Sequence, residues 1–158
     1  MRDKRFVAVH RDGSLTEYNH RQLIRWAREC SEYVLSLLAE NIDERLIHAL
    51  HVAKEWEKDT AKVGDAMKAS LAAHAVARES VNATSTAVAR SVGQAVATAH
   101  MADHSLGAAL YALKAVKHAG KAVDEEREWQ NKQLQQLPAE MVKLVSTSLI
   151  EKEKAWRV

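Results

Sequence analysis

The sequence contains few of the residues that interrupt regular secondary structure. Its 158 residues include five glycines and one proline. These two residue types most often mark turns and the ends of helices and strands. Because they are so scarce, we expect a small number of long elements, and long elements in globular proteins are usually helices. The sequence therefore predicts an all-α fold.

Cysteine is equally scarce. The chain has one cysteine, Cys30, so an internal disulfide is excluded. Cys30 continues the helical spacing of Leu23, Ala27 and Val34. A free cysteine in such a row usually behaves as a small buried hydrophobic residue. We therefore expect Cys30 to be part of the core and not a nucleophile.

Long apolar runs and a strong charge of one sign are also missing. No apolar run approaches the roughly 18 residues of a membrane span. The short patch Phe6–Val9 is too brief for the apolar part of a signal peptide. The net charge of +2, from 23 basic and 21 acidic residues, is too balanced to predict binding to nucleic acid. We expect a cytoplasmic protein that binds neither nucleic acid nor a membrane.

The common sequence signatures of enzymes are missing as well. The chain has no glycine-rich phosphate loop, no Gly-x-Ser-x-Gly sequence and no Cys-x-x-Cys pair. The sequence therefore favours a function without catalysis and predicts no cofactor.

Alanine is abundant in the middle of the chain. Roughly a third of residues 61–122 are alanine, the strongest helix former. Small side chains also let helix axes approach toward the low end of the usual range of about 8–10 Å. We therefore expect closely packed central helices, covered by the larger apolar side chains of the other helices.

The hydrophobic spacing predicts one domain built as a bundle of six to seven helices. We expect a helical core over residues 19–136 and, after Pro138, a C-terminal helix over residues 139–156. Residues with a preference for helix ends divide the core further. Asn19, Asp43 and Asn82 are predicted N-caps, and Gly120 a predicted C-cap.

Two parts of the helical core allow specific predictions. A row of residues spaced three to four apart predicts the inward face of the third helix: Val63, Met67, Leu71, His74, Ala77 and Val81. The segment Met101–Ser105 is ambiguous. It belongs either to one helix of about 36 residues or to a break in which Asp103 caps a new helix. The usual helix length favours the break.

Residues 5–18 contain the only candidate β structure. Asp12-Gly13 lies between the runs Phe6–Val9 and Leu15–Tyr18, which is a hairpin signal. A lone hairpin is only marginally stable in water. We therefore expect an arm packed on the helices, formed either as a hairpin or as an extended lead-in.

Three histidines form the candidate metal site. His100 and His104 would share one face of a continuous helix, and His74 lies in the inward row of the third helix. Two imidazoles at this spacing can bind one metal ion. The alternative is structural, because buried histidines commonly form hydrogen bonds between helices. If Asp103 starts a new helix, the spacing argument for His100 and His104 no longer applies.

Two tryptophans are candidates for binding a protein partner. Trp129 and Trp156 lie in the polar C-terminal third of the chain, unlike Trp26 and Trp56. Tryptophan is enriched among the residues that dominate binding energy at interfaces. We expect Trp129 and Trp156 to contribute to a binding surface, while Trp26 and Trp56 pack in the core.

Several blocks of sequence together resemble one bacterial family. The blocks are Arg25–Cys30, Lys62–Ala66, Ala72–Ala75, Ala97–His104 and Ala109–Ala115. Their order and spacing over about residues 5–130 are similar to the "putative immunity protein" family, an immunity-five-like, all-helical family assigned to toxin–immunity systems. The resemblance implies a protein that binds and neutralises a bacterial toxin, and it implies no catalytic residues.

Two other functions remain open from the sequence. The first is a metal-binding helical protein, or a metal-dependent enzyme, that uses His74, His100 and His104. The second is a helical interaction module that self-associates, for which a symmetric homodimer is the usual arrangement. Self-association is compatible with the binding of a toxin.

Overall fold

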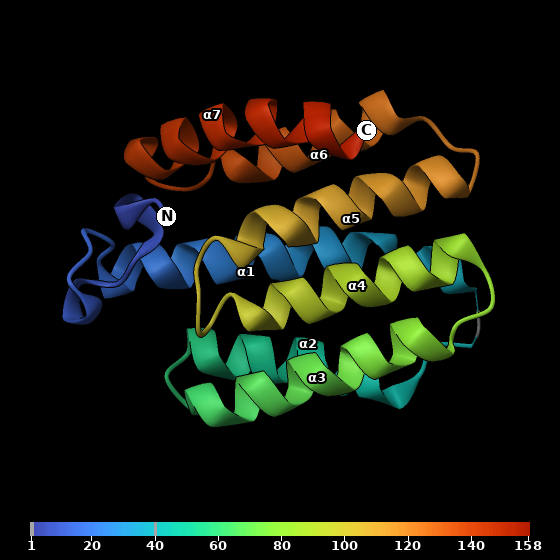
Figure 1. The fold of residues 1–158 in the computed structure, drawn as a ribbon, viewed down its shortest axis with the longest axis horizontal. Coiled ribbons are helices and arrows are strands. Elements are labelled where there is room, and N and C mark those ends of the chain that lie inside the picture. Colours follow the sequence, from blue (N-terminus) through green and yellow to red (C-terminus); the bar gives the residue numbers. More distant parts are fainter. Residues whose placement is uncertain (1, 40) are drawn as a thin grey trace.

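The computed structural model describes residues 2–39 and 41–158 and confirms the all-α prediction (Figure 1). The helices are α1 (Glu17–Val34), α2 (Glu44–Glu57), α3 (Val63–Glu79), α4 (Ala83–Ala97), α5 (His104–His118), α6 (Val123–Leu134) and α7 (Ala139–Trp156). The described residues also form three 3-10 turns, η1 (Lys4–Phe6), η2 (Val9–Arg11) and η3 (Leu35–Leu38). They contain no β-strand, and Ala8 and Leu15 form an isolated bridge.

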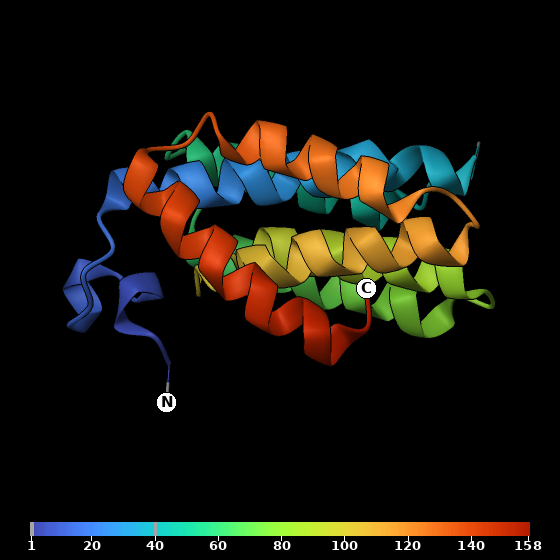
Figure 2. The same ribbon diagram turned by 90° about the horizontal axis from the view of Figure 1, so that it is seen from above.

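The helices pack in two layers that lie face to face (Figures 1 and 2). One layer contains α3, α4 and α5, the other contains α2, α1 and α6, and α7 runs obliquely across one side of both layers. Within the layers, α4 contacts both α3 and α5, and α1 contacts both α2 and α6. Contacts of α1 with α4 and α5 join the two layers at the centre of the bundle.

Most of the predicted helix ends are confirmed. The side chains of Asp43 and Asn82 accept hydrogen bonds from backbone N–H groups at the starts of α2 and α4. Gly120 follows α5 with a φ of 73°, a left-handed conformation that glycine adopts without strain. The helix is interrupted between Ala97 and His104, as predicted, so α4 and α5 are antiparallel neighbours.

The predicted start of α1 at Asn19 is wrong, since the helix begins at Glu17. Thr16 is the N-cap, and its hydroxyl accepts a hydrogen bond from the backbone N–H of Asn19. The Asn19 side chain is buried and donates a hydrogen bond of 2.7 Å to Glu140 on α7. Asn19 is therefore used for a tertiary contact, which local capping preferences do not reveal.

The N-terminal arm forms without the paired strands of a hairpin. Leu15 donates a backbone hydrogen bond to Val7 and accepts one from Val9, and this exchange makes the single bridge. The flanking residues turn into η1 and η2 instead of extending. Phe6 and Leu15 are buried against the helices, so packing onto the bundle determines the conformation of the arm.

Alanine allows the central helices to approach closely, as expected. Ala27, Ala95 and Ala108 are fully buried where α1, α4 and α5 meet. A short chain of hydrogen bonds crosses the same contact. The Ser31 and Ser91 hydroxyls are 2.8 Å apart, and Ser91 donates to the carbonyl oxygen of Ala108 at 2.7 Å. These bonds satisfy the buried hydroxyl groups and tie the three helices together.

The predicted inward row on α3 is wrong for most of its members. Val63, Met67, Leu71 and Val81 are 39%, 47%, 70% and 99% exposed. The buried face of α3 consists of small residues instead: Ala66, Ala69, Ser70, Ala73 and Ala77. Helix α3 packs against both α2 and α4, and side chains of this small size allow that close packing. The larger side chains consequently lie on the solvent side.

Helices α6 and α7 cover the side of the bundle formed by α1 and α5 (Figure 2). The fully buried Trp26 indole donates a hydrogen bond to the carbonyl oxygen of Gln130, and the Gln130 amide donates to the carbonyl oxygen of Ala109. This relay connects α1, α6 and α5. Among the described residues, no helix combines the length and apolar character that crossing a membrane requires.

Candidate functional site

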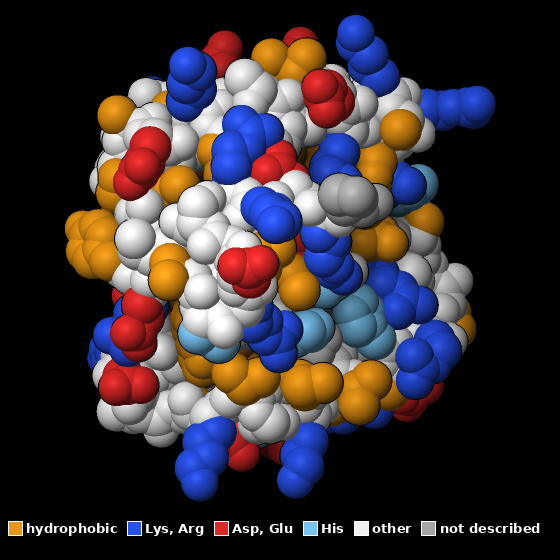
Figure 3. Space-filling model, turned by 60° about the vertical axis from the view of Figure 1, so that its left-hand side comes forward, with side chains coloured by type: hydrophobic (Ala, Val, Ile, Leu, Met, Phe, Trp, Pro, Cys, Tyr) orange, Lys and Arg blue, Asp and Glu red, His pale blue; other side chains and the backbone are white. Residues whose placement is uncertain are grey.

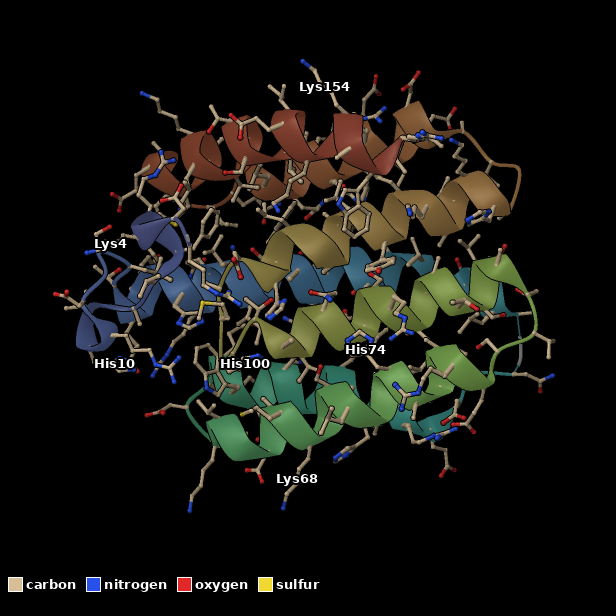
Figure 4. The ribbon with its side chains drawn as sticks, viewed as in Figure 1. Lys4, His10, Lys68, His74, His100 and Lys154 are labelled. Carbon is tan, nitrogen blue, oxygen red and sulfur yellow. The ribbon has the colours of Figure 1, made fainter. Side chains whose placement is uncertain are left out.

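The three candidate metal ligands lie near α4 but are engaged with protein groups. His74 on α3 has its Nδ1 atom 2.8 Å from an Arg90 guanidinium nitrogen. His104 has its Nδ1 atom 2.7 Å from the side-chain oxygen of Gln94. The His100 and His104 rings are 5.1 Å apart between centroids, even though the helix breaks between them. Figure 4 shows His74 between α3 and α4, and His100 at the end of α4.

This geometry offers little support for a metal ion. In the parts of the chain that the structure describes, no group of three or more His, Cys, Asp or Glu side chains is placed to hold one. The Arg90 guanidinium donates to His74, and its fixed positive charge would oppose a nearby cation. Metal binding by His74, His100 and His104 stays a prediction, and their hydrogen bonds fit the structural alternative.

Two glycines make room for these polar contacts. A Cβ atom on Gly93 would lie 2.6 Å from Nε2 of His74. A Cβ atom on Gly107 would lie 2.8 Å from the side-chain oxygen of Gln94, the partner of His104. Gly93 therefore leaves the space that the His74 ring occupies, whereas the end of the flexible Gln94 side chain lies over Gly107. Sequence reasoning missed them because each occupies an ordinary position within a helix.

Replacing His74 with alanine is expected to lower the free energy of unfolding by about 1–3 kcal/mol near neutral pH, because Arg90 loses its acceptor. Burial, followed by the charges of Arg90 and Arg78, lowers the pKa of His74 from 6.5 to about 4. As the pH falls, His74 therefore takes up a proton in the unfolded chain before it does so in the folded protein. The free energy of unfolding consequently decreases as the pH falls from 6.5 to about 4. Denaturant unfolding at several pH values should show a shallower decrease in the His74→Ala variant.

His118 provides the matched control, because it is exposed near the end of α5. The His118→Ala variant should keep the wild-type stability. If His74→Ala and wild type lose stability equally between pH ~6.5 and ~4, the structural role assigned to His74 is wrong.

A pocket with a volume of about 470 Å³ lies between the N-terminal arm and the bundle. Its walls include His20, Trp56 and His100, together with His10 and Arg11 of the arm. The His20 ring packs on Trp56 at 4.7 Å, and its Nε2 atom is 2.6 Å from the carbonyl oxygen of Thr98. Figure 3 shows histidine side chains on this face with lysine and arginine side chains around them.

Trp129 lies on α6 and stacks on Tyr33 near the end of α1. Its ring lies parallel to that of Tyr33, with 3.8 Å between centroids and 7° between planes. Tyr33 is 49% exposed and Trp129 is half-buried, so the stack reaches the surface. Tyr33 also borders a hollow of about 280 Å³ between the end of α1, η3 and the start of α6.

Glu126 forms part of the wall of this hollow and is the most unusual acidic residue of the described chain. It is only 5% exposed, and its Oε1 atom is buried without a hydrogen-bond partner. Burial raises the pKa of Glu126 to about 7, and the nearby Gln130 amide offsets part of that effect. On α1, burial and then the charge of Glu126 raise the pKa of the Cys30 thiol, which rules out an activated thiolate.

Sequence reasoning did not single out Glu126. It lies within the run Asp124–Glu128, which resembles an ordinary solvated acidic face. Asp124, Glu125 and Glu128 are indeed exposed. The helical spacing distinguishes Glu126 from the rest of this run, because Glu126 lies four residues before Gln130, whose buried amide bonds the carbonyl oxygen of Ala109.

Trp156 makes contacts within the protein. Its ring packs edge-on against Tyr111 of α5 at 4.7 Å, and the Lys114 ammonium lies 5.0 Å from the ring centroid. These contacts attach the end of α7 to α5. A role for Trp156 in binding a partner stays a prediction, and Trp129 is the better placed of the two.

The exposed side of α3 presents a second surface that sequence reasoning assigned to the core. Val63, Met67 and Leu71 follow one another at intervals of four residues, which places them in a row along the helix. Val63 also borders the pocket beneath the arm. The homodimer predicted from the sequence has no further support from this surface and stays a prediction.

Comparison with known proteins relates this chain to a protein family. The family model described as Imm-5 like putative immunity protein matches residues 13–137 of this chain. The match includes α1 to α6 and ends at Leu137, just before α7. Neither the curated proteins nor the solved structures contain a match.

Proposed function

The chain belongs to the Imm-5 like putative immunity protein family, and from this premise we propose that it binds a protein toxin and neutralises it without catalysis. The proposed binding surface is the exposed end of α1 together with the start of α6. We refer to this surface, formed by Tyr33, Trp129 and the hollow bordered by Glu126, as the α1–α6 surface.

The observation that carries this choice is the stacked pair of Tyr33 and Trp129 beside a hollow. Aromatic side chains at the edge of a pocket supply a large contact area and lose little conformational entropy on binding. Both residues lie within the segment that matches the family model. Trp156, by contrast, follows that segment and already packs on Tyr111 and Lys114.

A protein that neutralises a toxin by covering its surface needs no catalytic group. Cys30 is fully buried and its pKa is raised, so it is a poor nucleophile. The three candidate metal ligands use ring nitrogens for hydrogen bonds or pack on one another. Support for the proposal thus comes from a surface and not from a reactive site.

The test is co-expression with the product of the neighbouring gene, followed by measurement of toxicity and of binding by the purified proteins. We expect a complex with wild type and rescue of growth. Trp129→Ala should weaken binding by more than about 30-fold, because central tryptophans at interfaces typically contribute at least about 2 kcal/mol. Trp156→Ala is the matched control and should bind nearly as wild type.

Thermal melting of each variant shows whether a loss of binding reflects unfolding. The proposed surface is wrong if folded Trp129→Ala binds the toxin as tightly as wild type. The proposed function itself is wrong if wild type neither binds nor neutralises the product of the adjacent gene.

A further inference from the structure

The hollow of the α1–α6 surface has acidic and aromatic walls but no ion pair. Tyr33 and Ser36 border it from the end of α1 and from η3, and Glu125 and Glu126 border it from α6. Lys121, which precedes α6, is the one cationic side chain on its wall. Neither Glu125 nor Glu126 forms a salt bridge in residues 2–39 and 41–158 (compare the pairs of Arg127 with Asp124 and Glu153).

The buried carboxyl group of Glu126 lacks the partner that would compensate its burial. A carboxylate removed from water is costly unless a cation or several hydrogen-bond donors accompany it. Glu126 is 5% exposed, and its Oε1 atom has no partner. A cation brought in from outside would supply the missing interaction, and Glu126 borders the hollow through which such a cation would approach.

We propose that the hollow receives a lysine or arginine side chain of the toxin, with Glu126 as its counter-ion and the Tyr33–Trp129 stack as its aromatic neighbour. This inference rests on the proposed function, because it names the chemistry of the partner at the α1–α6 surface. A cation is favoured by two independent features of the same site. Carboxylates attract it electrostatically and accept its charge-assisted hydrogen bonds, and the face of an aromatic ring attracts a cation.

Binding of a cation at this site is coupled to loss of a proton. Glu126 is about half ionised in the free protein at neutral pH, because burial raises its pKa to about 7. The bound cation favours the carboxylate, so the pKa decreases in the complex and affinity decreases as the pH is lowered. The other ionisable groups around the site are Lys121 and Glu125 at the hollow, and Glu29 and Cys30 on α1.

Small probes can test the site without the toxin. Nα-acetyl-arginine amide supplies the cation, and Nα-acetyl-citrulline amide supplies a neutral side chain of almost the same shape. Binding is measured from the shift of the Trp129 indole N–H signal in nuclear magnetic resonance spectra. We expect the arginine probe to move this signal and the citrulline probe to leave it in place.

The dependence on pH tests the counter-ion without any substitution. Between pH 8 and pH 6 the fraction of ionised Glu126 falls about tenfold for a pKa near 7. The affinity of the arginine probe should fall by a similar factor. An affinity that stays constant over this range, or equal binding of the two probes, would overturn the proposal.

Matched variants then assign the effect to one residue. Glu126→Gln should lower the affinity for the arginine probe by at least about tenfold and abolish the dependence of that affinity on pH. Glu128→Gln makes the same change at an exposed position of α6 that does not border the hollow, and it should behave as wild type. Lys121→Ala removes the competing cation and should strengthen binding. If the Glu126→Gln variant binds the arginine probe with the wild-type affinity and the wild-type dependence on pH, the site is not the one proposed.

The outcomes separate this inference from the proposed function. A toxin that binds wild type and Glu126→Gln equally well supports an immunity function but refutes Glu126 as the counter-ion. Selective, pH-dependent binding of the arginine probe together with no binding of the toxin supports the cation site and refutes the immunity function.

Discussion

Replacing Trp26 with alanine is expected to lower the free energy of unfolding by about 3–5 kcal/mol, the usual range for a buried tryptophan. Trp26 is fully buried on α1 within the cluster that also contains residues of the arm, α5 and α7. Its removal would leave a cavity where these segments meet. It would also remove the hydrogen bond from the indole to Gln130, whose amide in turn bonds Ala109.

The size of this effect relative to total stability makes it easy to detect. Native domains have unfolding free energies of about 5–15 kcal/mol, so a loss of 3–5 kcal/mol is a large fraction. Denaturant titration followed by circular dichroism measures it directly. Trp156→Ala removes a half-buried tryptophan from the end of α7 and should cost less. Equal losses for the two variants would contradict the central role of Trp26.

Replacing Ala108 with leucine is expected to be comparably damaging, although it adds apolar surface. Overpacking of a tight core costs about 1–3 kcal/mol and sometimes more. We expect the upper end of that range or beyond, because Ala108 meets Ala27 and Ala95 where three helices converge. A larger side chain would push α5 from α1 and α4. It would also strain the hydrogen bond from Ser91 to the Ala108 carbonyl oxygen.

The control for this prediction is an alanine on the surface of a helix. Ala155 is exposed near the end of α7, so Ala155→Leu adds the same volume without displacing another helix. Thermal unfolding should show a clear decrease for Ala108→Leu and little change for Ala155→Leu. A stable, cooperatively folding Ala108→Leu variant would show that the helices can separate at low cost and that alanine is not required there.

These predictions place stability and recognition in different parts of the molecule. The alanine contacts and the Trp26–Gln130 relay hold α1, α4, α5 and α6 in fixed positions. Trp129 and Glu126 lie on the α1–α6 surface, next to that relay, because Gln130 is four residues beyond Glu126 on the same helix. A well-anchored α6 would present its aromatic and acidic groups to a partner with little loss of conformational freedom.

The features that depend on local sequence were predictable. Asp43, Asn82 and Gly120 mark helix ends because capping and left-handed geometry involve only a few neighbouring residues. The scarcity of glycine and proline indicated long helices for the same reason. Seven helices over the described residues 2–39 and 41–158 agree with that reading. Thr16, rather than Asn19, caps α1, and the Asn19 side chain instead bonds Glu140 on α7.

The candidate sites were only partly predictable, since they depend on which helices become neighbours. Trp129 was singled out from the sequence as a surface residue, but its stack with Tyr33 joins residues from two different helices. His74 and His104 were grouped as metal ligands from the sequence, but the fold gives each of them a different hydrogen-bond partner. Glu126 was missed because Asp124, Glu125 and Glu128 in the same acidic run are exposed, and its own burial depends on how the helices pack.

The sequence by itself determined the helical class, most helix ends and the family, because composition, capping and the order of sequence blocks are properties of the chain read locally. Only the tertiary structure decided which face of each helix is buried. On α3 the row of larger apolar residues Val63, Met67 and Leu71 faces solvent, while alanines pack between α2 and α4. The physical reason is distance: where helices approach this closely, small side chains fit and larger ones do not.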